Sequence, residues 1–152
     1  EELVKYIFLR YLIYPGKEFC EPLDGIIYSV TISMGFAAME NILHIVFWSE
    51  SFMEGLEIAY YRMLTAVSAH AAFAMVMGYF VGLAKFKPAM ETFYLMCGLA
   101  GAVILHGLYD FFIFQQMSES LTVYTFVTLI FALVIGKLMV RRHRVESPYK
   151  TD

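Results

Sequence analysis

Four long stretches in which apolar residues dominate constrain this chain more than any other feature of its sequence. They cover residues 25–48, 58–84, 89–116 and 120–140. A helix of about 20 apolar residues crosses the roughly 30 Å hydrocarbon core of a bilayer, and each stretch reaches that length. Composition agrees, because 60% of the residues are hydrophobic and 16% are charged, whereas soluble domains average about 45–50% and about 25%. The sequence therefore predicts an all-α, polytopic transmembrane helix bundle with four complete spans.

A fifth helix is predicted from residue 1 to about Tyr14, too short to cross the membrane by itself and therefore a partial span. Pro15 and Gly16 end it, because proline disfavours helical backbone in the residue before it and glycine favours a turn. No signal sequence precedes Glu1, which falls within a helical pattern. We therefore expect further segments upstream in the parent protein.

Lysine and arginine occur in every second connection between the predicted spans. The segments that carry them are 15–24, 84–88 and 141–152. The intervening connections, 49–57 and 117–120, contain neither residue. Because cytoplasmic loops are the basic ones, we expect a multi-pass protein of the cell membrane with a cytoplasmic C-terminus. We divide the chain into one transmembrane domain, 1–140, and a basic cytoplasmic tail, 141–152.

Charge and cysteine content narrow the choice of partners. A net charge of −3 provides no excess of positive charge for a phosphate backbone, so we expect membrane lipid and no nucleic acid as a partner. Cys20 lies in a polar loop and Cys97 in an apolar stretch. This pair forms neither a disulfide framework nor a metal-ligand pattern.

A few ionisable residues lie inside the predicted helices, where a charged side chain costs about 2.5–3.5 kcal/mol on insertion scales. They include Glu1, Glu2, Glu40, His70, His106 and Asp110. A rise of about 1.5 Å per residue places the first five roughly 19–26 Å from the predicted cytoplasmic helix ends, with Asp110 one turn further. Four separate helices thus contribute polar groups to one layer, which indicates a shared functional site.

Small residues recur at intervals of four on the helices that carry the histidines. One series is Ala66, His70, Ala74, Gly78 and Gly82, and the other is Gly98, Ala102, His106 and Asp110. Small residues at this interval let helices pack closely in lipid. Both imidazoles are therefore predicted to face neighbouring helices.

Simpler interpretations exist for each residue taken alone. A membrane histidine often bridges helices by hydrogen bonds, and Glu40 and His44 can satisfy each other at helical spacing. Asp110 can simply hold the ring of His106, and Arg62 can extend to the lipid headgroups. The agreement in depth across four helices favours a functional site over these separate explanations.

Several motifs together resemble one known family. They are Glu1-Glu2-x-x-Lys5, Asp24-Gly25-Ile26-Ile27-Tyr28, Phe36-Ala37-Ala38-Met39-Glu40-Asn41, His70 and His106-Gly107-Leu108-Tyr109-Asp110-Phe111. The combination resembles the PrsW intramembrane proteases from residue 1 to about 116. It is similar more distantly to the CAAX prenyl endopeptidases and to the APH-1 subunit of gamma-secretase.

The resemblance implies a polytopic, all-helical protease that acts on a membrane-anchored protein such as an anti-sigma factor. It assigns the family's glutamate pair to Glu1 and Glu2, its second acidic motif to Glu40 and its histidines to His70 and His106. Members of the family carry further spans before the glutamate pair. The related prenyl endopeptidases have histidine at the position of Glu40.

Peptide hydrolysis needs a base for water, an oxyanion stabiliser and a proton donor for the leaving amine. Our hypothesis is that Glu1 or Glu2 activates water. Glu2 is favoured because Lys5, four residues after Glu1, can neutralise Glu1, whereas Glu2 projects elsewhere. His70 or His106 would then donate to the oxyanion, and Asp110 would orient His106.

Three alternatives use the same residues. Although we favour a mechanism without a cofactor, His70, His106 and Glu2 could hold a catalytic zinc ion with an open fourth position. A non-catalytic scaffold resembling APH-1 would use the polar cluster for assembly only. A proton-coupled transporter would also bury glutamate and histidine, but such folds more often show internal repeats, and the two halves of this chain show none.

Overall fold

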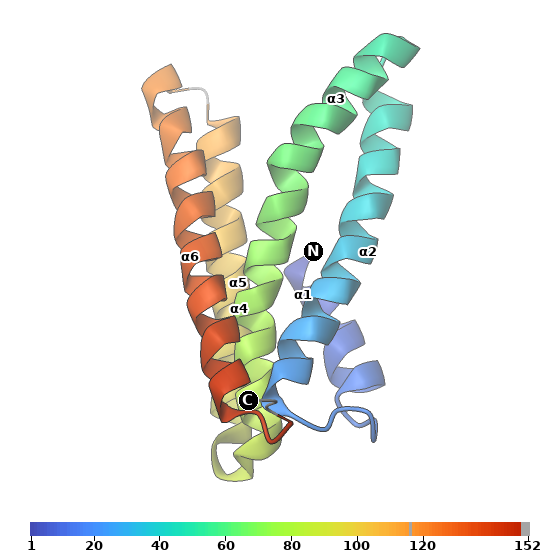
Figure 1. Cartoon of the computed structure of the whole chain (residues 1–152). Coiled ribbons are helices and arrows are strands. Elements are labelled where there is room, and N and C mark those ends of the chain that lie inside the picture. The colour runs from blue at the N-terminus through green and yellow to red at the C-terminus, as the bar shows by residue number, and fades with distance from the viewer. Residues whose placement is uncertain (116, 150–152) are drawn as a thin grey trace.

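The computed structural model describes residues 1–115 and 117–149, and these residues form a bundle of helices that confirms the predicted fold class (Figure 1). The α-helices are α1 (Glu2–Phe8), α2 (Pro22–Trp48), α3 (Phe52–Leu64), α4 (Ala66–Phe86), α5 (Glu91–Phe114) and α6 (Val123–Glu146). A π-helical turn, Leu9–Ile13, extends α1, and 3₁₀ turns at Pro88–Met90 and Glu119–Thr122 precede α5 and α6. Gln116, at the end of the third expected span, and residues 150–152 of the expected tail lie outside the described residues.

Four helical segments within the described residues are long and apolar enough to cross a membrane, as predicted. They are Pro22–Trp48, Phe52–Phe86, Pro88–Phe114 and Glu119–Glu146. The chain is therefore a membrane protein. The last helix continues into the segment that we expected to be tail, because residues 141–147 contain no proline or glycine that would end it.

The second span differs from its prediction at both ends of α3. Its helix begins at Phe52, inside the expected connection 49–57, because the Ser51 side chain accepts a hydrogen bond from the Glu54 N–H at 3.3 Å and caps the helix. The helix is then interrupted at Thr65, where α3 ends and α4 begins. This break lies one turn from His70, so it falls beside the candidate site.

The centre of the bundle is α4, which packs against α2, α5 and α6 and has most of its side chains buried. Its glycines allow the backbones to touch. A Cβ atom at Gly78 would collide with the carbonyl oxygen of Gly25 in α2, and one at Gly82 would collide with that of Pro22. The predicted close packing along this small-residue series is confirmed.

The short α1 begins at about half the height of the bundle, beside α2 and α5 (Figure 1). Two polar contacts anchor the end of this segment. Lys85 Nζ donates to the Tyr14 carbonyl oxygen at 2.6 Å, and Arg10 Nη2 lies 3.3 Å from Glu91 Oε1. These contacts hold the end of this segment against α4 and the start of α5.

Candidate active site

Polar residues from four helices meet inside the apolar bundle. Glu1 and Glu2 at the start of α1, His70 in α4 and His106 in α5 each place a potential ligand atom within 4.8 Å of the others. Glu40 in α2 joins them through His70. The structure therefore brings together groups that are more than 100 residues apart in the sequence.

Lys5 lies at the centre of this cluster. Its Nζ is 2.6 Å from Glu2 Oε1 and donates to His70 Nδ1 at 2.8 Å, while Glu1 Oε2 is more distant at 3.6 Å. Lys5 and Glu2 are 3% and 4% exposed, and a charge buried to this extent needs a partner. The expected pair of Lys5 with Glu1 is present at the longer distance, but the expectation that Glu2 projects elsewhere is wrong, because residues three apart share a helix face as closely as residues four apart.

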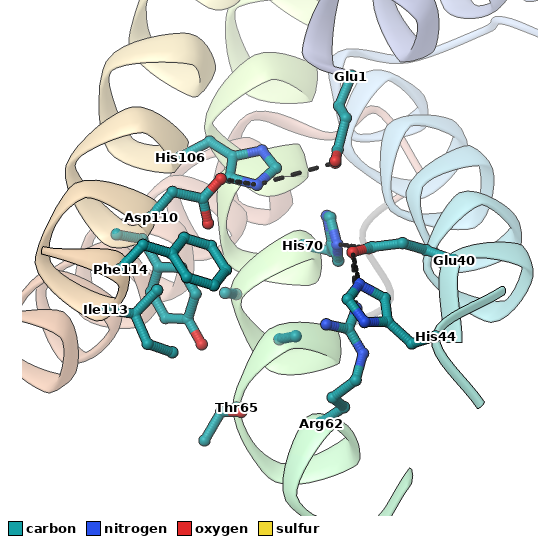
Figure 2. Close-up of a pocket in the computed structure, with 13 residues that line it drawn as sticks. Glu1, Glu40, His44, Arg62, Thr65, His70, His106, Asp110, Ile113 and Phe114 are labelled. Atoms are coloured by element: carbon teal, nitrogen blue, oxygen red, sulfur yellow. Dashed lines mark hydrogen bonds and ion pairs between the residues drawn. The ribbon is translucent and has the colours of Figure 1, made fainter. Parts of the chain in front are cut away.

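His106 connects the two glutamates to α5. Its Nδ1 donates to Glu2 Oε1 at 2.9 Å. Its Nε2 lies 3.5 Å from Asp110 Oδ2 and 3.8 Å from Glu1 Oε2, and Figure 2 shows Glu1 and Asp110 both approaching this ring. The acid and the imidazole on α5 thus lie within ion-pair distance of each other, and the orienting role of Asp110 stays a prediction.

Glu40 of α2 contacts His70 and two further basic side chains of the cluster. Its Oε2 accepts from His70 Nε2 at 2.7 Å, and its Oε1 lies 2.7 Å from Arg62 Nη2 and 3.3 Å from His44 Nε2 (Figure 2). Arg62 Nε also donates to Asn41 Oδ1 at 2.7 Å. The expectation that Arg62 extends to the headgroups is wrong, because these two α2 side chains hold its guanidinium inside the bundle.

Both ring nitrogens of His70 are engaged. An ammonium group can only donate, so Nδ1 accepts from Lys5 and Nε2 carries the proton donated to Glu40. The Ser33 hydroxyl also donates to the His70 carbonyl oxygen at 2.9 Å. His70 is therefore held between α1, α2 and α4, and its ring has no free donor.

A cavity of about 340 Å³ adjoins the cluster (Figure 2). Its polar lining consists of Glu1, Glu40, His44, Arg62, Thr65, His70, His106, Tyr109 and Asp110. Ile113 and Phe114 add an apolar wall. Glu2 does not border this cavity, although it lines a smaller one of about 270 Å³ with Glu1, His106 and Asp110.

Sequence reasoning did not assign five residues of the described site, which are Lys5, Asn41, His44, Arg62 and Tyr109. The sequence contains a feature that points to each of these residues. Lys5, Asn41 and Tyr109 belong to the quoted motifs, and His44 is at helical spacing from Glu40. Arg62 is a cation within a predicted span, where charges usually serve a function.

The donor set is suited to zinc in its chemistry. Two imidazoles and two carboxylates lie within 4.8 Å, and Glu2 Oε2 is buried without a hydrogen-bond donor among the described residues. Histidine nitrogen and carboxylate oxygen are common zinc ligands. The Lys5 ammonium contacts Glu2 and His70 and would have to move before a cation could use those two groups.

The comparisons with known proteins agree with this geometry. Residues 1–136 match the family described as PrsW family intramembrane metalloprotease, which extends the similarity well into α6, beyond residue 116. The chain is 40% identical over 116 residues to Protease PrsW of Geobacillus kaustophilus, covering 76% of this chain and 49% of that protein. It is 33% identical over 138 residues to Protease PrsW of Oceanobacillus iheyensis, covering 91% and 61%.

Protease PrsW of Bacillus subtilis is 38% identical over 112 residues, covering 73% of this chain and 49% of the relative. The chain thus spans about half to three fifths of the length of these relatives. No solved structure matches it. The family match covers most of the chain and includes every helix of the polar cluster, so the chain belongs to the PrsW protease family.

Proposed function

We propose that this chain forms the active site of an intramembrane endopeptidase of the cell membrane. One observation carries the proposal: carboxylates and imidazoles from α1, α2, α4 and α5 meet and border one cavity inside an apolar bundle. Placing so many ionisable groups in a membrane costs free energy, so such groups are rare and usually serve a function. The substrate that we propose is a membrane-anchored protein of the anti-sigma-factor type, as the family resemblance implies.

Glu1 is the better placed general base. Its carboxylate borders the cavity and is partly exposed, with its Lys5 contact at 3.6 Å. Glu2 is buried, contacts Lys5 at 2.6 Å and accepts a hydrogen bond from His106. A carboxylate whose lone pairs are already engaged is a poorer acceptor for the proton of water, so the geometry favours Glu1 over our earlier preference for Glu2.

In the proposed reaction, a water molecule attacks the peptide carbonyl carbon while Glu1 takes one of its protons. His106 Nε2, held towards the cavity by the Nδ1 bond to Glu2, is placed to donate to the carbonyl oxygen when protonated. The carbon–nitrogen bond then breaks, and the Glu1 carboxyl returns its proton to the leaving amine. His70 contacts both Lys5 of α1 and Glu40 of α2, and these contacts hold the two helices beside the reacting groups.

The test is the appearance of new peptide termini in membrane proteins when the full-length parent protein is expressed. Terminal peptides are quantified by mass spectrometry for the wild type, Glu1→Gln, Glu2→Gln and Glu57→Gln. We expect Glu1→Gln to lower cleavage about 100-fold or more, the usual effect of losing a general base. Glu57, an exposed carboxylate in α3, is the matched control and should leave cleavage unchanged.

Two other outcomes decide the assignment. Loss of cleavage in Glu2→Gln together with full activity in Glu1→Gln would return the base to Glu2. Full activity in both variants would reject a glutamate-activated water, and no cleavage by the wild type would favour the scaffold interpretation.

A zinc-dependent protease is a second candidate, favoured by the four-residue donor set and by the free Glu2 Oε2. His70, His106 and a glutamate would hold the ion, which would supply Lewis-acid polarisation of the peptide carbonyl. Elemental analysis of purified protein separates the two schemes. About one zinc per active chain, lost together with activity on chelation, would support the metal, and Lys5→Met should then increase zinc affinity because the competing ammonium is removed.

A further inference from the structure

A second cavity, of about 510 Å³, lies at the other end of the bundle, near the ends of α4 and α6 and the start of α5. It shares no lining residue with the candidate active site. Much of its wall is aliphatic, formed by Leu83 of α4 and by Ile135, Leu138 and Met139 of α6. We call this cavity the basic groove, for the two cations described next.

Lys87 and Arg142 line the same groove. Lys87 directly follows α4, and Arg142 is in the last turns of α6. The ends of these two helices lie at the lower end of the bundle in Figure 1. Arg142 Nε is 3.4 Å from Glu146 Oε1. Among the described residues, no carboxylate lies within 4.0 Å of the Lys87 ammonium, so the groove has an excess of positive charge.

Aromatic side chains form the remaining wall. Phe80 stacks on Tyr94 with ring centroids 6.5 Å apart, and Tyr79 contacts Phe80 edge-on at 5.3 Å. Lys87 Nζ lies 6.0 Å from the Tyr94 ring centroid. Tyrosine favours the level at which acyl chains meet headgroups, so the groove joins an apolar surface to a cationic one at that level.

We propose that the basic groove binds an anionic glycerophospholipid. Its phosphate lies between Lys87 and Arg142, and an acyl chain follows Leu83, Ile135 and Met139. Charge complementarity selects this occupant, because basic pockets between transmembrane helices recognise anionic headgroups. A zwitterionic choline lipid would bring its own cation beside two existing ones and bind less tightly.

The test is native mass spectrometry of the full-length protein in detergent. The protein is titrated with phosphatidylglycerol or with phosphatidylcholine of identical acyl chains. We expect wild-type protein to bind phosphatidylglycerol about tenfold more tightly, in line with the attraction of two cations to an anionic lipid. The double variant Lys87→Gln/Arg142→Gln should bind the two lipids equally.

The matched control is Arg141→Gln/Arg144→Gln, which also removes two positive charges but takes both from the last turns of α6, outside the groove. It should keep the preference for phosphatidylglycerol. An equal loss of preference in the control, or no preference in the wild type, would overturn the proposal.

A third variant tests the path of the acyl chain. Ile135→Trp fills the apolar part of the groove and leaves both cations in place, so it should weaken the binding of both lipids. Unchanged phosphatidylglycerol binding in this variant would place the lipid elsewhere and also reject the proposal.

Discussion

Single side chains decide which groups of the polar cluster contact one another, and Lys5 has the largest effect. Its ammonium joins a carboxylate of its own helix to an imidazole of α4, so α1 is tied to the centre of the bundle by a buried cation. Helical spacing allowed a contact with either glutamate. Only the packing of α1 against α2 and α5 makes Glu2 the nearer one.

Arg62 is predicted to be a positioning residue for the reaction. Arg62→Gln should lower kcat about 10- to 100-fold with little change in KM, the range typical for the loss of an outer contact of an active-site group. The reason is that Glu40 would lose its 2.7 Å ion pair and hold His70 less firmly. The measurement is steady-state cleavage of a substrate identified from the new termini.

Two further variants separate positioning from folding. Arg62→Lys keeps the charge and should recover part of kcat. Arg10→Gln removes a different arginine–glutamate pair, at 3.3 Å from Glu91, and should leave kcat unchanged because neither residue lines the cavity. Wild-type kcat in Arg62→Gln would show that the contact has no role in turnover.

At the level of helices, the contact between α2 and α4 carries much of the site, because Glu40 and His70 meet across it. The glycines of both helices bring the two backbones together in the same interface, nearer the start of α2 and the end of α4. Close backbone approach therefore sets the distance at which the two polar side chains face each other.

Gly78→Ala should lower the free energy of unfolding by about 1–3 kcal/mol, the usual cost of forcing an extra methyl into a packed interface. The new Cβ would meet the Gly25 backbone, which cannot move aside as a flexible side chain can. Chemical denaturation in detergent micelles measures the change.

Gly35→Ala in α2 is the control, because no atom lies within 4 Å of the added Cβ. It should be neutral or slightly stabilising, since alanine favours helix more than glycine does. Equal stability of the two variants would show that the contact between α2 and α4 tolerates a wider separation.

For the whole molecule, the alternation of basic connections predicts that the segment containing Cys20 faces the cytoplasm. Cys20 is exposed. In the parent protein with Cys97 and any other cysteine replaced, a membrane-impermeant maleimide should label Cys20 in inverted vesicles and not in intact spheroplasts. Glu50→Cys, at the other end of α2, should show the opposite pattern, and labelling of Cys20 in spheroplasts would reverse the topology.

The sequence by itself determined the number of spans in this chain, their approximate bounds and six of the residues that meet near the middle of the bundle, which are Glu1, Glu2, Glu40, His70, His106 and Asp110. These follow from local rules: apolar length sets a span, a helix satisfies its own backbone, and rise per residue sets depth. The family motifs pointed to the same residues independently of depth.

The tertiary structure decided which atoms meet. It placed Lys5 on Glu2, moved Arg62 from the headgroup region to Glu40 and Asn41, and put Glu1 rather than Glu2 beside the larger cavity. None of this follows from spacing along one helix, because rotation of a helix and its distance from its neighbours depend on packing against several partners at once.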